Sequence, residues 1–107
     1  MEIIFHAHHA VISAHMRQRA ERAVNRIAKR LHTPPTEAIV RFERDSGLCR
    51  VELQLNAPRQ RRLVAEGHGR FYGPALAEAA RRLEAQVPAK DTPKTRTRER
   101  ARMIGRV

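Results

Sequence analysis

The stretch ISAHMRQRAERAVNRIAKRLH, residues 12–32, decides the fold, because its pattern is that of an amphipathic helix. Apolar residues recur at spacings of three and four, which places one stripe along a helix: Met16, Ala20, Val24, Ile27 and Leu31. Ser13 has the side chain typical of a helix N-cap. Pro34 and Pro35 end the helix in this prediction, because neither can donate a backbone hydrogen bond. The apolar stripe needs an apolar surface to cover.

The segments around this helix have the pattern of β-strands. Residues 2–9, EIIFHAHH, form the first expected strand, and residues 37–44 and 48–56 flank the turn sequence DSG at 45–47. The strand at 48–56 alternates cleanly, with four residues predicted to face inward: Cys49, Val51, Leu53 and Leu55. Residues 63–69 form a weaker fourth strand that contains glycine.

A second helix is predicted to follow Gly73, with Pro74 in its first turn and Pro88 beyond its end. Its apolar stripe contains Leu76, Ala79, Ala80, Leu83 and Val87. The predicted fold is therefore α+β, a two-layer sandwich of order β-α-β-β-β-α, in which both helices cover one face of a four-stranded sheet. The crossover helix makes the first two strands parallel neighbours, and the other pairs are antiparallel.

Residues 1–87 form the expected folded domain, and residues 88–107 form a basic C-terminal tail. That tail contains seven positively charged residues and only two negatively charged ones, Asp91 and Glu99, so we expect it to be disordered on its own. The whole chain of 107 residues has a formal net charge of +11. Such a balance favours a polyanionic partner, either nucleic acid or an anionic membrane surface.

Composition excludes several other classes of protein. No apolar run approaches the roughly 18 residues of a spanning helix, and the N-terminus does not resemble a signal peptide, so a soluble cytoplasmic chain that does not bind membranes is expected. The single cysteine, Cys49, rules out an internal disulfide and a cysteine zinc site. Its place among inward residues predicts a small buried side chain rather than a nucleophile.

Histidines are the most visible candidates for metal ligands. His6 and His8 fall on one face of the first strand, but a catalytic zinc needs three protein ligands. The next outward candidate, His68, lies three strand spacings away, about 14 Å. The acids Glu43, Asp45, Glu52 and Glu66 occupy outward positions or a turn, where solvated carboxylates are ordinary. We therefore predict no enzyme, no catalytic residue, no metal, no cofactor and no small-molecule substrate.

Basic residues are concentrated on three segments. The first helix carries Arg17, Arg19, Arg22, Arg26, Lys29 and Arg30, the second helix carries Arg81 and Arg82, and the loop before the fourth strand carries Arg59, Arg61 and Arg62. The exposed aromatics of an RRM, a GXXG loop and a helix-turn-helix pattern are all absent. Phosphate contacts with structured RNA are therefore favoured over base readout. A general structured-RNA module and a merely solvated basic face are the alternatives that charge alone leaves open.

The stretches FHAHHAVISAHMRQRAERAVNRIAKRLH, VELQLNAP and LVAEGHGRFYGPALAEAARRLEAQV together resemble one known family. The chain is similar over residues 1–87 to the short type of the ribosome hibernation-promoting factor and ribosome-associated inhibitor family, also called sigma-54 modulation or ribosomal subunit interface proteins. The matching landmarks are His8, His9, Ser13, the pair Met16 and Arg17, the pair Arg82 and Leu83, and Gln86. No single landmark identifies the family; the resemblance is specific because all of these residues occur together at the family's spacing.

This resemblance implies a cytoplasmic stress or stationary-phase factor that binds the small ribosomal subunit. It would lie between head and body, contact ribosomal RNA where messenger and transfer RNAs sit, and block translation by occupancy. The implied RNA contacts are Arg22, Arg26, Lys29, Arg81 and Arg82, with Arg17, Arg19 and Arg30 as secondary candidates. The protein is expected to be a monomer when it is not bound to the ribosome. Long members of the family carry a C-terminal dimerisation domain that this sequence lacks, so the chain is not expected to pair ribosomes by itself. The entry GRFYGPAL departs from the family pattern, so Phe71 or Tyr72 matches its tyrosine.

Overall fold

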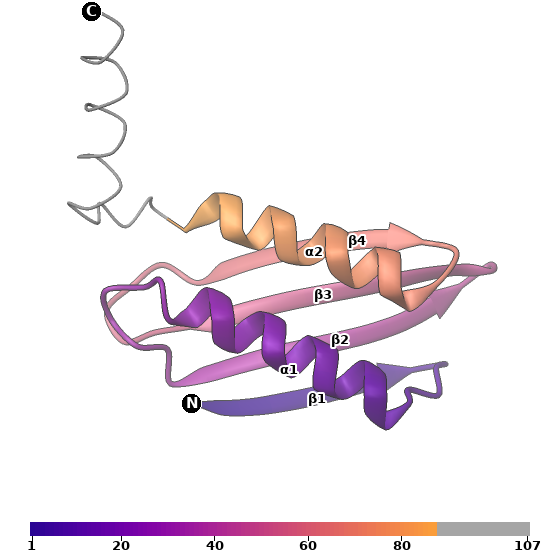
Figure 1. Cartoon of the computed structure of the whole chain (residues 1–107), viewed down its shortest axis with the longest axis horizontal. Helices are drawn as coiled ribbons and strands as arrows, with labels where there is room; N and C mark the ends of the chain where they lie inside the picture. The colour runs from indigo at the N-terminus through magenta and orange to yellow at the C-terminus, as the bar shows by residue number, and fades with distance from the viewer. Residues whose placement is uncertain (88–107) are drawn as a thin grey trace, which may run out of the picture.

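The computed structural model describes residues 1–87, so the predicted tail at 88–107 lies outside the described part. The elements are β1 (Glu2–His8), α1 (Ala14–Ala28), β2 (Glu37–Asp45), β3 (Leu48–Asn56), β4 (Leu63–Gly69) and α2 (Tyr72–Gln86). The strands lie in the order β1-β2-β3-β4, with β1 parallel to β2 and the other pairs antiparallel. Both helices lie on one face of the sheet (Figure 1). The predicted α+β fold and its element order are confirmed.

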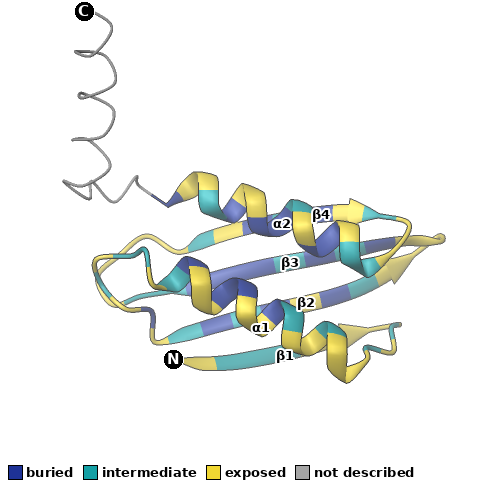
Figure 2. Cartoon of the chain, in the orientation of Figure 1, coloured by how far each residue is buried: buried dark blue, intermediate teal, exposed yellow. Residues whose placement is uncertain are grey.

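The hydrophobic core lies between the helices and the inward face of the sheet (Figure 2). All four inward residues predicted for β3 are buried. The largest fully buried side chains, Phe42 of β2, Ile27 of α1 and Leu83 of α2, come from three elements. Because the stripes that the sequence predicts are the ones that pack, the alternation in β3 and the helical periodicity carry most of the information about this core.

Helix α1 begins as the sequence predicts but ends earlier. The Ser13 side chain accepts a hydrogen bond from the backbone nitrogen of Met16 at 3.1 Å, which makes Ser13 the N-cap. The helix ends at Ala28, whereas the prediction extended it to the prolines. Tighter backbone bonds follow, from the nitrogen of Arg30 to Ile27 and from that of Leu31 to Ala28. This turn starts the chain toward β2 while Leu31 still packs against the core.

Replacing Ser13 by alanine is expected to lower the free energy of unfolding by about 1 kcal/mol, because the Met16 amide loses its acceptor. The melting temperature should fall by about 4–8 °C, and urea unfolding followed by circular dichroism measures the change. Ser13→Asp is the matched control, since aspartate also caps helices and should retain most of the stability. Equal stability of both variants and the original chain would contradict a role for the cap.

Two glycines occupy positions that suit a residue without a side chain, one because of its backbone conformation and the other because of the space available. Ser46 and Gly47 both have positive φ, 52° and 80°, which is the signature of a two-residue hairpin turn between β2 and β3. Gly67 is buried in β4 beneath α2, where a Cβ atom would meet the backbone oxygen of Ala75 and lie 2.6 Å from the backbone nitrogen of Ala79. The missing side chain lets α2 lie directly on β4. The glycine that weakens the strand signal in the sequence is thus explained by helix–strand contact.

Candidate nucleic-acid interface

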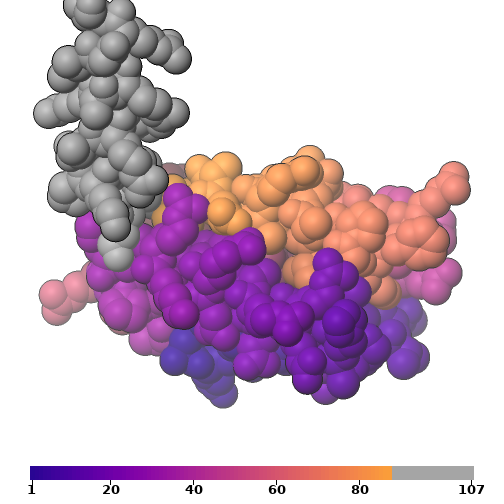
Figure 3. Space-filling view, viewed as in Figure 1, coloured from indigo at the N-terminus to yellow at the C-terminus, as the bar shows by residue number. Residues whose placement is uncertain are grey.

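A groove runs between α1 and α2 on the helical face of the molecule, where the two helices lie side by side (Figure 3). We call it the helical groove; it has a volume of about 510 Å³ and is lined by Arg19, Arg22, Ala23, Arg26, Leu76, Ala77, Ala80, Arg81 and Glu84. Alanines from both helices leave space that larger side chains would fill. Four arginines against one glutamate make the lining strongly cationic.

Helical periodicity explains why these arginines come together. Arg19, Arg22 and Arg26 are three and four residues apart, so they follow one side of α1. Arg81 faces them from α2. The guanidinium of Arg19 reaches the start of α2, where its Nη1 atom would lie 3.1 Å from a Cβ atom at Gly73. The groove therefore combines three primary candidates of the sequence prediction, Arg22, Arg26 and Arg81, with one secondary candidate, Arg19.

Glu84 divides these arginines into two groups. Its carboxylate accepts hydrogen bonds from Arg26 at 2.7 Å and from Arg30 at 3.1 Å, so the charges of these two arginines are partly offset. Arg19, Arg22 and Arg81 form no salt bridge within residues 1–87, although the charge of Arg81 helps to lower the pKa of Glu78. An uncompensated guanidinium beside a groove can bind phosphate bidentately. These three side chains are therefore the strongest candidates for anion contacts.

Arg82 points to a different side of α2 from its neighbour Arg81. Its Nη1 atom donates to the backbone oxygen of Glu66 in β4 at 3.1 Å and lies 3.7 Å from Glu78. Glu78 and Gln86 lie one helical turn before and one turn after Arg82 on the same side of α2. Glu78 accepts a hydrogen bond from the backbone nitrogen of His68, and Gln86 donates one to the backbone oxygen of Val64. These three side chains cover the outer edge of β4, which would otherwise have unpaired backbone groups. Arg82 thus has a structural partner and lies outside the groove.

The remaining candidates lie around or beyond the groove. Arg17 is exposed on α1 without lining the groove, and Lys29 is the C-cap of that helix. The loop at residues 57–62 carries Arg59, whose φ is +59°, together with Arg61 and Arg62, which line a separate cavity. The predicted basic surface is therefore divided by the fold into a groove, a helix end and a loop.

The open face of the sheet holds an ion-pair network that the sequence analysis missed. Arg50 of β3 donates to Glu66 at 2.9 Å, to Glu43 at 3.0 Å and to Glu52 at 3.2 Å. The register explains the cluster, because Glu43 lies opposite Arg50 and Glu52 opposite Glu66. Three of the four carboxylates interpreted as simply solvated thus share one guanidinium. Alternation alone could have placed them on one face, but only the strand register shows that they meet.

These contacts shift two pKa values in opposite directions. The hydrogen bond from Arg50 lowers the pKa of Glu66, and the same bond raises the pKa of Arg50. A carboxyl group whose pKa is lowered by folding stabilises the fold above its unfolded value, about 4.3. That contribution is lost as the pH falls through the pKa of the folded state. The network should therefore stabilise the fold at neutral pH and not in strong acid.

Arg50→Met is expected to lower the free energy of unfolding by about 1 kcal/mol at neutral pH, since it leaves three like charges together and solvent screens each pair. The loss should shrink at strongly acidic pH, as the pH falls through the lowered pKa of Glu66. Urea unfolding at both pH values measures the difference. Arg41→Met is the control, because Arg41 makes one longer contact, 3.5 Å to Glu52. A loss for Arg50→Met that is independent of pH would contradict the electrostatic origin.

The histidines of β1 and the turn after it lie far from His68, although the rings of His8 and His9 meet with centroids 4.2 Å apart. His6 is opposite Arg41 and His8 is opposite Glu43, while His68 belongs to β4 at the other edge. Within residues 1–87 no group of three histidine, cysteine, aspartate or glutamate side chains is placed to hold a metal ion. His9 has a φ of +53° and marks the turn toward α1. In the same part of the chain, no helix combines the length and apolar character needed to cross a membrane.

Three residues near the start of α2 have distinct environments. Cys49 is buried, as predicted, and its Sγ atom donates to the backbone oxygen of Arg70 at 3.5 Å. The ring of Tyr72 packs edge-on against Phe42 with centroids 5.6 Å apart, and burial raises the pKa of its hydroxyl. Phe71, the N-cap residue of α2, is 70% exposed. An exposed aromatic at a helix start is a candidate base-stacking group, a role that the sequence analysis did not assign to Phe71.

Residues 3–91 match the family described as sigma 54 modulation protein / S30EA ribosomal protein. A ribosomal subunit interface protein from Coxiella burnetii is similar in structure, with a TM-score of 0.69 at 16% identity over 81% of this chain and 93% of that one. The N-terminal domain of Protein Y from Thermus thermophilus has a TM-score of 0.69 at 23% identity, over 80% of this chain and 94% of that domain. No curated protein matches the sequence.

The two structural similarities establish a shared fold, and the family match extends over most of the chain, including every described helix and strand apart from the first residue of β1. The family is one of ribosome-associated factors and is not an enzyme family. The resemblance drawn from the sequence landmarks is confirmed by this match. The chain belongs to the sigma 54 modulation protein / S30EA ribosomal protein family.

Proposed function

We propose that this chain binds the small ribosomal subunit through the helical groove and blocks translation by occupying the channel of messenger and transfer RNA. The observation that carries the proposal is the set of three arginines, Arg19, Arg22 and Arg81, that line one groove and form no salt bridge within the described residues. Phosphate groups of ribosomal RNA would supply the missing negative charge. Membership of a ribosome-associated family supports this choice of partner, as does the structural similarity to a ribosomal subunit interface protein.

In this proposal the chain acts by binding, in the cytoplasm, without catalysis or a cofactor. The domain at residues 1–87 would be sufficient for binding, since it contains the whole groove. Arg26 would contact RNA while it remains paired with Glu84. Arg17, Lys29 and Arg30 would extend the contact along α1 and beyond its end. Arg82 would act indirectly, by fixing α2 against β4.

Phe71 would add a stacking contact to the phosphate contacts. Its side chain is exposed two residues before Gly73, where the Arg19 guanidinium lies. Stacking of a base on an aromatic side chain is worth about 1–3 kcal/mol. The neighbouring Tyr72 cannot take this role in the described conformation, because its hydroxyl is buried and its ring packs on Phe42.

Sedimentation of the chain with purified small ribosomal subunits tests the proposal. Co-migration at about 50 mM salt is expected, with affinity falling steeply as salt rises because phosphate contacts release counterions. The net charge of +11 also favours a second candidate, a general structured-RNA module. Excess duplex RNA of arbitrary sequence separates the two: it should leave ribosome binding largely intact if the proposal holds. Full displacement by duplex, or no co-migration at low salt, would reject ribosome-specific binding.

A further inference from the structure

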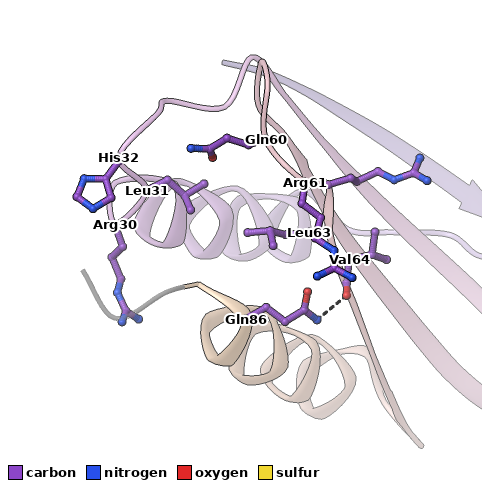
Figure 4. A pocket seen from close by; sticks show the side chains of 9 residues that line it. Arg30, Leu31, His32, Gln60, Arg61, Leu63, Val64 and Gln86 are labelled. Carbon is purple, nitrogen blue, oxygen red and sulfur yellow. Dashed lines mark hydrogen bonds between the residues drawn. The ribbon is translucent and has the colours of Figure 1, made fainter. Parts of the chain in front are cut away.

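A second cavity lies at the end of the sandwich where both helices end and the loop between β3 and β4 turns (Figure 4). We call it the end cavity; its volume of about 620 Å³ lies within the 300–1,000 Å³ usual for ligand sites. Its lining contains the arginines Arg30, Arg61 and Arg62 and the imidazole of His32, and none of the described residues that line it is a carboxylate. The electrostatics of this site therefore favour an anion.

Apolar side chains form the inner part of the end cavity. Leu31 and Leu63 are half-buried, and their side chains extend into the space between the end of α1 and the loop (Figure 4). Val64 contributes its backbone to this lining, because strand alternation turns its side chain to the opposite face of the sheet from Leu63. A bare phosphate or sulfate would leave these surfaces in contact with water. The lining is better matched by an anion that also carries a flat, largely apolar body.

Two anchored carboxamides provide hydrogen-bonding groups at the same place. Gln60 donates from Nε2 to the hydroxyl of Thr33 at 2.9 Å, and Gln86 donates from Nε2 to the backbone oxygen of Val64 at 2.6 Å. Each amide nitrogen is thereby held in place, which leaves the amide oxygen as an acceptor. Exocyclic amino groups of nucleobases are matching donors. The arginines at the rim, the apolar wall of Leu31 and Leu63, and the amide acceptors together fit one nucleotide. Its phosphate would lie at the rim and its base inside the cavity.

The end cavity adjoins the helical groove through one ion-pair triad. Glu84 lines the groove and pairs with Arg30, which lines the cavity, and with Arg26, which lines the groove. Its negative charge is thus offset by two arginines and does not separate the two sites electrostatically. A strand held in the groove would raise the local concentration of its next nucleotide at the cavity.

We propose that the end cavity takes up one unpaired nucleotide of the RNA strand whose phosphates occupy the helical groove. This inference rests on the proposed RNA binding and adds a base-sized contact to it. A tethered nucleotide is favoured over a free one because the cavity is open to solvent and its loop is exposed, so the cavity alone offers little to hold a free ligand.

Methyl NMR signals of Leu31 and Leu63 in the full chain test the inference. The probes are a single-stranded RNA 12-mer of mixed sequence, the same 12-mer with abasic sites throughout, and adenosine monophosphate. The intact 12-mer should shift these signals through the ring current of the inserted base. The abasic 12-mer should shift signals of the groove residues Arg22 and Arg81 and leave the methyl signals of Leu31 and Leu63 unchanged.

Each contrary outcome identifies what has failed. Groove shifts without methyl shifts on adding the intact 12-mer would reject the nucleotide site and leave RNA binding in place. The absence of any shift with either oligomer would reject RNA binding and this inference with it. Methyl shifts that saturate with adenosine monophosphate at concentrations as low as those of the 12-mer would assign the cavity to a free nucleotide and reject the tethered one.

A pair of loop variants provides an independent measurement. Arg62→Gln removes a cation that lines the cavity, whereas Arg59→Gln removes the same charge from the same exposed loop outside the cavity lining. Affinity for the intact 12-mer should fall about fivefold to tenfold for Arg62→Gln at ~0.1 M salt, as expected for one phosphate contact. Arg59→Gln should change it much less. Equal losses for both variants would reject a specific role for the cavity.

Discussion

Replacing Arg22 and Arg81 together by glutamine is expected to weaken binding to small ribosomal subunits about fiftyfold at ~0.1 M salt. The two side chains face one another across the helical groove, and neither forms a salt bridge within the described residues. Each lost phosphate contact removes about 0.9 from the slope of log affinity against log salt, with duplex DNA as the guide. The salt slope should therefore become shallower by about 1.8, and the effect on affinity should vanish toward 1 M salt.

Arg41→Gln with Arg44→Gln is the matched control, because both arginines lie on β2 and neither lines the groove. This pair removes the same total charge and should change affinity much less. Binding is measured by sedimentation or filter binding at several salt concentrations, and circular dichroism verifies that both double variants fold. If the control pair weakened binding as much as the groove pair, the contact would depend on net charge and not on the groove.

Replacing Gly67 by alanine is expected to lower the free energy of unfolding by about 3 kcal/mol, the upper end of the usual cost of overpacking. The added Cβ atom meets backbone atoms of Ala75 and Ala79, which cannot turn aside as a flexible side chain can. Helix α2 would have to move away from β4, which would also disturb the bonds of Glu78, Arg82 and Gln86 to the strand edge. The melting temperature should fall by roughly 12–24 °C.

Gly69→Ala is the control for this prediction, since Gly69 lies two residues further along the same strand and on the same face. A Cβ atom there has its nearest contacts at 3.4 Å and 3.5 Å, which is ordinary packing. Its stability should change by less than about 1 kcal/mol. Calorimetry of the two variants decides the matter: similar melting temperatures would show that the packing of α2 on β4 does not depend on the missing side chain.

Much of the fold was predictable because it depends on local periodicity. The apolar stripe from Met16 to Leu31 predicts the side of α1 that packs against the core. The alternation from Cys49 to Leu55 does the same for β3. The cap at Ser13 was predictable for the same reason, since its partner Met16 is three residues away. The end of α1 was predicted too late, because Pro34 and Pro35 set only an outer limit and the turn after Ala28 depends on the route to β2.

The candidate site was less predictable, because its geometry depends on contacts distant in sequence. Arg81 and Arg82 are equivalent in the sequence analysis, yet one lines the groove and the other binds the backbone of β4. Arg26 and Arg30 meet Glu84 across separations of 58 and 54 residues. No pattern within a helix shows such a partner. Phe71 and Tyr72 are likewise adjacent aromatic residues, but the Tyr72 ring packs against Phe42 whereas the Phe71 side chain is exposed.

The sequence by itself determined the order of the elements, the inward face of each and the positive sign of the molecule. These properties follow from composition and from the fixed periods of helix and strand. Only the tertiary structure decided which arginines of the described residues form salt bridges that hold the fold together and which form none. The reason is that charge compensation is a matter of distance in space, and the distances between α1, α2 and β4 are set by core packing, down to the single absent side chain at Gly67.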